Sequence, residues 1–166
     1  MHRIIALLAL LLFVAPAAAQ ESPPRPVSQI ALLPLPASGA DDVAALLKAH
    51  WGQYFETGTD QGFGRDAVRI GYFDLNGDGK VELLVMVTRP DWATDAGQPI
   101  AVAAWTGAAW NAIGWSWGDE DTVFATDEIV ARWRTIDTGS QWLRWDNGLY
   151  GRVDKEGTGA PKALDQ

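Results

Sequence analysis

Oxygen-bearing side chains recur at alternate positions in one short stretch of the chain, residues 74–82, with the sequence DLNGDGKVE. Asp74, Asn76 and Asp78 supply three of them, and Glu82 adds a carboxylate four residues later. Hard cations such as Ca²⁺ take six to eight oxygen ligands, which a tight loop provides by turning alternate side chains toward one ion. The spacing therefore predicts a Ca²⁺ site that uses these four side chains and the main-chain carbonyl of Lys80.

The longer stretch DLNGDGKVELLVM resembles the calcium loop of FG-GAP (VCBS-type) repeats, in which the loop runs directly into a strand. Its first nine positions also resemble an EF-hand or dockerin loop. At the twelfth position, where an EF-hand carries a bidentate Glu, this chain has Val85. The resemblance implies one weak Ca²⁺ site between two strands. FG-GAP propellers need several such loops and dockerins need two, whereas this chain has one, so neither architecture is expected.

The same residues also suit a plain turn. Asn-Gly and Asp-Gly pairs are strong hairpin signals because both tolerate positive φ. Residues 69–73 and 81–87 would then be two strands joined by an acidic, solvated connection. A plain hairpin needs neither three alternating oxygen ligands nor a fourth carboxylate, so the pattern favours the cation site.

Residues 1–19 are typical of a secretory signal peptide. A short polar start with Arg3 precedes an apolar run of about a dozen residues, and the sequence AAA at 17–19 supplies the small side chains that signal peptidase requires. The apolar run is shorter than the ~20 residues that span a bilayer. The sequence therefore predicts cleavage near Gln20, a periplasmic or secreted location, and no membrane attachment after cleavage.

Composition limits the function classes. The chain has 13 Lys and Arg against 21 Asp and Glu, a formal net charge of −8, and this balance argues against nucleic acid as a partner. It contains no Cys, which excludes thiol chemistry and Cys-based zinc sites. The expected organisation is a Pro-rich linker at 20–37, a single globular domain at 38–151 and a flexible tail at 152–166.

The expected fold class is α+β, with one N-terminal helix packed on a mainly antiparallel β-sheet built from hairpins. The helix begins after Ser38, and its apolar positions form one stripe: Val43, Leu46, Leu47, His50, Trp51, Tyr54 and Phe55. Residues 81–87 are apolar on both faces and predict an interior strand. Aromatic residues that face each other across glycine turns predict hairpins at 100–117 and around 145–150. Residues 128–136 alternate as a further strand.

No residue pattern supports catalysis. The sequence GWSWG at 114–118 matches the G-x-S-x-G nucleophile elbow, but that elbow needs a strand-to-helix turn and a later histidine. His50 is the last histidine in the chain. On its apolar stripe, a packed histidine with one hydrogen bond is the favoured interpretation, and a metal ligand or general base is the alternative. The protein is therefore expected not to be an enzyme.

Nine Trp residues are the outlier in the composition. Trp115 and Trp117, two apart on a strand, would project to one side and form a stacking platform for a glycan, or they would fill the core. The favoured hypothesis is a non-enzymatic binding or interaction module of the cell envelope with one structural Ca²⁺ site. A carbohydrate- or peptidoglycan-binding module and a small periplasmic inhibitor are the alternatives, with an envelope protein or glycan as the partner.

Overall fold

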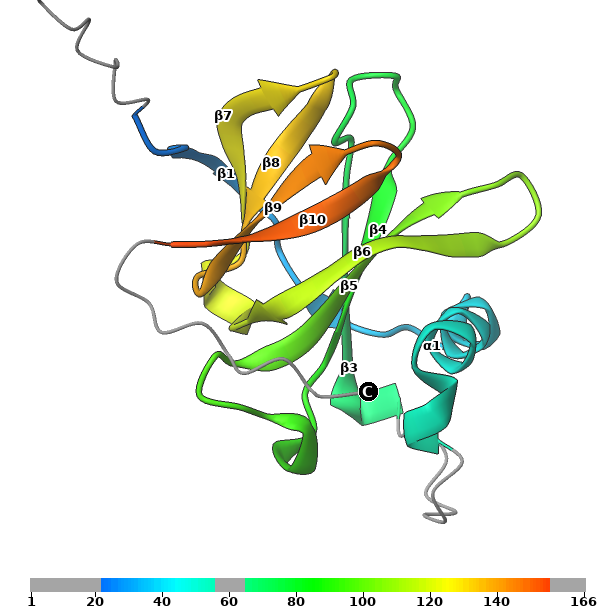
Figure 1. The fold of residues 1–166 in the computed structure, drawn as a ribbon. Coiled ribbons are helices and arrows are strands. Elements are labelled where there is room, and N and C mark those ends of the chain that lie inside the picture. The colour runs from blue at the N-terminus through cyan, green and yellow to red at the C-terminus, as the bar shows by residue number, and fades with distance from the viewer. Residues whose placement is uncertain (1–21, 56–64, 156–166) are drawn as a thin grey trace, which may run out of the picture.

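A computed structural model describes residues 22–55 and 65–155 (Figure 1). Within these residues the chain forms one α-helix and a ten-stranded sheet that curls into a half-barrel. The strand order is β1-β7-β8-β9-β10-β6-β5-β4-β3-β2. The α+β class and the mainly antiparallel sheet expected from the sequence are confirmed.

The sheet is built largely from hairpins that follow one another along the chain. Its strands are β1 (Pro26–Gln29), β2 (Leu33–Pro34), β3 (Val68–Phe73), β4 (Glu82–Val87), β5 (Gln98–Trp105), β6 (Trp110–Gly118), β7 (Phe124–Val130), β8 (Trp133–Asp137), β9 (Gln141–Asp146) and β10 (Leu149–Asp154). Helix α1 (Ala40–Phe55) precedes β3, and the short 3₁₀ turns are Arg65–Ala67, Pro90–Trp92 and Glu120–Thr122. Among the described residues, no helix is long and apolar enough to cross a membrane.

One seam in the sheet is parallel. Strand β10 lies beside β6 with a single registered pair, Tyr150 opposite Gly114, whereas all the other named strand pairs are antiparallel. A Cβ atom at position 114 would lie 2.4 Å from the Cβ atom of Tyr150. Because no real Cβ approaches so closely, only glycine allows the β3–β6 half of the sheet to meet the β7–β10 half here.

The curled sheet has a core on each face. Helix α1 covers the outer face of β3–β6 through Val43, Leu46, Leu47 and Trp51, which pack with side chains such as Val85. The inner face encloses a second core, to which both halves of the sheet and residues 30–32 contribute; it includes Ile30, Leu84, Val102, Ile136 and Leu143. All six residues of β4 are buried, which confirms the interior strand predicted from its two apolar faces.

Helix α1 confirms the predicted apolar stripe as far as its side chains are described. The side chains of Tyr54 and Phe55, and residues 56–64 that follow the helix, lie outside the description. The hairpins β5–β6 and β9–β10 stand where aromatic residues face each other across glycine turns, as predicted.

Three expectations are wrong. Residues 26–29 and 33–34 of the expected linker are strands that pair with β7 and β3, because edge strands accept the prolines that central strands reject. The expected strand at 128–136 is the hairpin β7–β8, which turns at Ala131 and Arg132 with φ of 48° and 77°. Strand β10 runs to Asp154, so residues 152–154 belong to the sheet; residues 156–166 of the expected tail lie outside the description.

Candidate functional site

The acidic stretch forms the connection between β3 and β4, and Figure 1 shows this connection beside the β7–β8 hairpin. The loop, residues 74–81, is anchored at Leu75, whose side chain is 1% exposed within the inner core. The carbonyl of Leu75 accepts a hydrogen bond from the N–H of Arg134 in β8, with an N–O distance of 2.8 Å. The loop therefore connects the two halves of the curled sheet.

The Asp74 carboxylate organises the loop backbone. Its Oδ1 accepts the N–H groups of Gly77 at 2.7 Å and Asp78 at 3.2 Å, and its Oδ2 accepts that of Gly79 at 3.0 Å. Gly77 and Gly79 have φ of 71° and 84°, a conformation that glycine adopts without steric cost. The glycines thus permit the winding that directs three N–H groups toward a single carboxylate.

Asn76 and Asp78 repeat this pattern two residues apart. Asn76 Oδ1 accepts the N–H of Asp78 at 2.9 Å, and Asp78 Oδ1 accepts the N–H of Lys80 at 2.8 Å. Asn76 Nδ2 also donates to Asp78 Oδ2 and to Glu82 Oε1, both at 3.4 Å. The side chains predicted as ligands therefore lie along one continuous hydrogen-bonded loop, more elaborate than a plain two-residue hairpin turn.

Glu82 lies at the start of β4 and is only 4% exposed. Its Oε2 accepts the N–H of Leu75 at 2.8 Å. Burial raises the pKa of Glu82, the hydrogen bond from Leu75 partly opposes this, and the charges of Asp78 and Asp74 raise the pKa further. A cation bound at the loop would lower the pKa of Glu82 again, because a nearby positive charge favours the ionised carboxylate.

The loop offers hard oxygen donors, which suit Ca²⁺ in chemical type. In the part of the chain that the structure describes, no group of three or more His, Cys, Asp or Glu side chains converges closely enough to hold a metal ion. The three carboxylates instead accept hydrogen bonds from backbone N–H groups of the loop. Coordination of one ion would require these side chains to lie closer together than they do here.

The two tryptophans considered for stacking lie together on β6, with ring centroids 5.8 Å apart. Trp117 is buried, at 8% exposure. Trp115 is half-buried, and the guanidinium carbon of Arg152 lies 4.2 Å from the centroid of its ring. The pair does not present two open ring faces, so this arrangement favours a packing role for both residues.

A different set of rings is exposed. Tyr72 on β3 is 51% exposed and Trp105 at the end of β5 is 46% exposed. The half-buried Trp110 at the start of β6 joins them, with its ring centroid 5.3 Å from that of Trp105 and 6.2 Å from that of Tyr72. We call these three residues the aromatic surface. The sequence predicted that Trp105 and Trp110 face each other across a turn, but it did not single them out as a binding surface.

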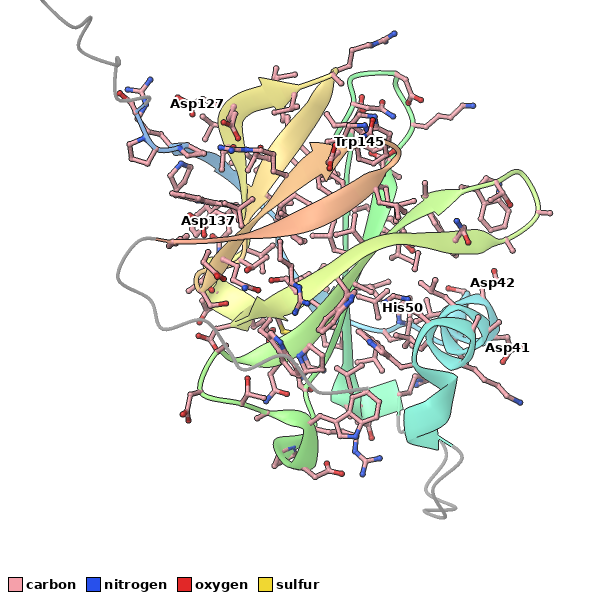
Figure 2. All side chains as sticks on the ribbon, viewed as in Figure 1. Asp41, Asp42, His50, Asp127, Asp137 and Trp145 are labelled. Carbon is pink, nitrogen blue, oxygen red and sulfur yellow. The ribbon has the colours of Figure 1, made fainter. Side chains whose placement is uncertain are left out.

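A second aromatic cluster lies against the inner core. Trp133 and Trp145 stack with centroids 4.0 Å apart and an interplanar angle of 11°, and Tyr150 meets both rings edge-on. Figure 2 labels Trp145 near the end of β9. The hydroxyl of Tyr150 donates to the carbonyl of Arg134 at 2.8 Å, and burial, followed by the charge of Glu82, raises the pKa of Tyr150. This cluster therefore borders the anchored end of the loop.

His50 and Ser116, the two residues considered for catalysis, are both packed within the fold. His50, labelled on α1 in Figure 2, packs against Trp51 with centroids 4.9 Å apart, and its Nε2 is buried without a hydrogen-bond partner in the described part of the chain. Burial lowers the pKa of His50. Ser116 is fully buried in the middle of β6 and donates to Gln141 Oε1 at 3.0 Å. The GWSWG sequence is thus part of a strand and lacks the strand-to-helix turn of a nucleophile elbow.

Comparison with known proteins finds no matching family model, no similar curated protein and no similar solved structure.

Proposed function

We propose that this protein is a non-enzymatic binding module of the cell envelope, periplasmic or secreted, in which one Ca²⁺ ion stabilises the loop at residues 74–82. Asp74, Asn76, Asp78 and Glu82 would hold the ion through side-chain oxygens, and Lys80 through its main-chain carbonyl. Water fills the remaining positions. The ion's role is structural, because it neutralises the negative charge of three carboxylates that lie within nine residues of one another.

The observation that carries this proposal is the anchoring of the loop to both halves of the sheet. Leu75 is buried in the inner core, its carbonyl binds β8, and its N–H binds the buried Glu82. A cation that fixes this loop would hold β3 and β4 against β8. The FG-GAP resemblance supports the same interpretation, since it places the calcium loop directly before a strand.

Calcium is expected to raise the melting temperature of the mature protein. Without the twelfth-position Glu, the dissociation constant is expected at about 10⁻⁴–10⁻³ M, as in extracellular modules. At ten times this constant, binding to the folded state alone stabilises it by about 1.4 kcal/mol. For a domain of this size the melting temperature should rise by roughly 3–6 °C. Thermal melts followed by circular dichroism, in EDTA and in about 10 mM CaCl₂, measure this shift.

Two variants make the calcium test specific. Asp78→Ala removes a central ligand and should abolish the calcium-dependent shift. Asp95→Ala removes an exposed acid outside the loop and should leave the shift intact. If the unmodified protein shows no shift, or if the Asp78 variant keeps it, the loop is only a connection between two strands.

A second candidate function, glycan binding, is favoured by the aromatic surface. Sugar rings bind to exposed aromatic faces, and Tyr72 and Trp105 are the two large aromatic residues with the most exposed side chains in the described chain. They lie at the end of the sheet where β3 enters the acidic loop and where β5 turns into β6. A polymer of sugar rings is the partner that this second candidate requires, and peptidoglycan is the glycan polymer of the bacterial envelope.

Trp105→Ala is expected to reduce co-sedimentation of the protein with purified peptidoglycan by at least tenfold, which corresponds to about 1.4 kcal/mol of binding free energy. Trp115→Ala is the matched control, because its ring is already covered by Arg152, and it should bind as the unmodified protein does. Circular dichroism confirms that each variant is folded before binding is scored. If Trp105→Ala co-sediments with peptidoglycan as well as the unmodified protein does, the proposal that this surface binds glycan is wrong.

A further inference from the structure

Both edges of the sheet are formed by one short segment of the chain. Strand β1 pairs with β7 at one edge, and β2 pairs with β3 at the other. Only residues 30–32 separate these two strands. We call residues 25–35 the N-terminal strap; in Figure 1 it runs from the blue β1 toward helix α1. The strap bridges the open sides of the half-barrel, so the inner core is enclosed only when the strap is in place.

The strap fits closely between the two edges. Ile30 donates its N–H to the carbonyl of Val123 at 2.9 Å, and Leu35 donates its N–H to the carbonyl of Val68 at 3.1 Å. The side chains of Ile30 and Leu32 are 1% and 5% exposed in the inner core. A Cβ atom at Gly71 of β3 would lie 2.8 Å from the carbonyl oxygen of Ala31. The edges of β3 and β7 thus form an acceptor site shaped for an extended segment.

Every one of these contacts joins the strap to residues from position 68 onward. Arg25 adds a further one, since its Nε and main-chain N–H both donate to the Asp127 carboxylate, at 2.9 and 2.8 Å. None of the contacts depends on which chain the strap belongs to. A strap from a second copy would make the same hydrogen bonds and bury the same side chains, which is the condition for domain exchange.

The connection from the strap to helix α1 is suited to opening. Residues 36–39, with the sequence PASG, are all exposed. Pro34 and Pro36 fix their own φ, and each disfavours helical backbone at the residue before it. Leu33 and Leu35 are therefore biased toward extended backbone, so the chain from the strap to residue 36 favours a straight path. A hinge that favours extended backbone lowers the free energy needed to move the strap out of its own half-barrel.

We propose that the site between β3 and β7 accepts the N-terminal strap of a second copy of this chain, giving a symmetric dimer in which each strap completes the other copy's barrel. The proposal is independent of calcium and of the aromatic surface. It identifies the partner as this same chain and the mode of recognition as strand addition to the β3 and β7 edges once their own strap has left them.

Engineered cysteines test this exchange, because the chain has no native Cys. Arg25→Cys with Asp127→Cys joins the strap to β7 at exposed positions, and Gln29→Cys with Phe124→Cys does so at a registered pair. Opposed residues of antiparallel strands lie within disulfide range. The mature chain is unfolded under reducing conditions, refolded at a series of protein concentrations, oxidised and separated without reductant. The control pair is Ala104→Cys with Asn111→Cys, which lie opposite each other within the β5–β6 hairpin. Exchange of the strap does not separate these two positions, so their disulfide should form within one chain.

Exchange predicts covalent dimers for both strap pairs. While dimers are a minor species, their ratio to monomers should rise about tenfold for each tenfold rise in protein concentration, by mass action. The control pair should give covalent monomers at every concentration. The proposal is overturned if both strap pairs yield only monomeric disulfides, or if the control pair gives as many dimers as they do. Having two strap pairs keeps the test decisive if one variant does not refold.

Discussion

Trp117→Ala is expected to lower the free energy of unfolding by about 3–5 kcal/mol, the usual cost of truncating a large buried aromatic side chain. Trp117 is 8% exposed in β6 and packs edge-on against Trp115. Because domains are stable by only about 5–15 kcal/mol, this variant should be marginally folded. Urea denaturation followed by circular dichroism gives the change in the transition midpoint and, through the slope, the change in free energy.

Trp105→Ala is the matched control for this loss, since it deletes the same side chain from a position that is 46% exposed. Its unfolding free energy should change by about 1 kcal/mol or less, because an exposed ring leaves no cavity behind. Similar losses in the two variants would contradict the assignment of Trp117 to packing and Trp105 to the surface.

Leu75→Ala is expected to lower the free energy of unfolding by about 2–5 kcal/mol, although most residues of the acidic loop around Leu75 are exposed. Its side chain is 1% exposed in the inner core, and its backbone binds both β8 and Glu82. Truncation leaves a cavity where the loop joins the two halves of the sheet. Denaturation in EDTA isolates this packing contribution from any contribution of calcium.

Leu149→Ala provides the comparison, because Leu149 is 57% exposed at the start of β10. The same truncation there should change the unfolding free energy by less than about 1 kcal/mol. If Leu75→Ala proves equally mild, the loop is not the tie between the two halves that the hydrogen bonds indicate.

The sequence was sufficient where local signals agree with the fold. Strand β4 is apolar on both faces because it is covered on both, and the β9–β10 turn has Asn147 and Gly148, which accept the positive φ that a tight turn requires. The β7–β8 turn was missed because Ala131 and Arg132 adopt positive φ without any of the residues that usually signal it. There the tertiary pairing overrides the local preference.

The strap and the aromatic surface could not be derived locally for a different reason. Prolines at 23–36 remove backbone donors, and only the edge position of β1 and β2 makes that loss tolerable. Trp105 and Trp117 both lie in apolar strands of the same hairpin, yet one is exposed and the other buried. Whether each side chain is buried depends on which distant elements cover its part of the hairpin. The order of the strands in the sheet decides this, and the hairpin sequence does not.

The pairing of β1 with β7 also determines how this chain reaches its folded state. Pro26 lies opposite Thr126, and Arg25 bonds to a residue 102 positions away, so β1 has no partner until β7 has been synthesised. Such long-range pairing is typical of domains that fold in roughly milliseconds to seconds. The conformational entropy of closing a large loop is lost before the stabilising contacts form. The strand order runs from β1 through β7–β10 to β6, so the sheet is continuous only in a chain that extends through β10.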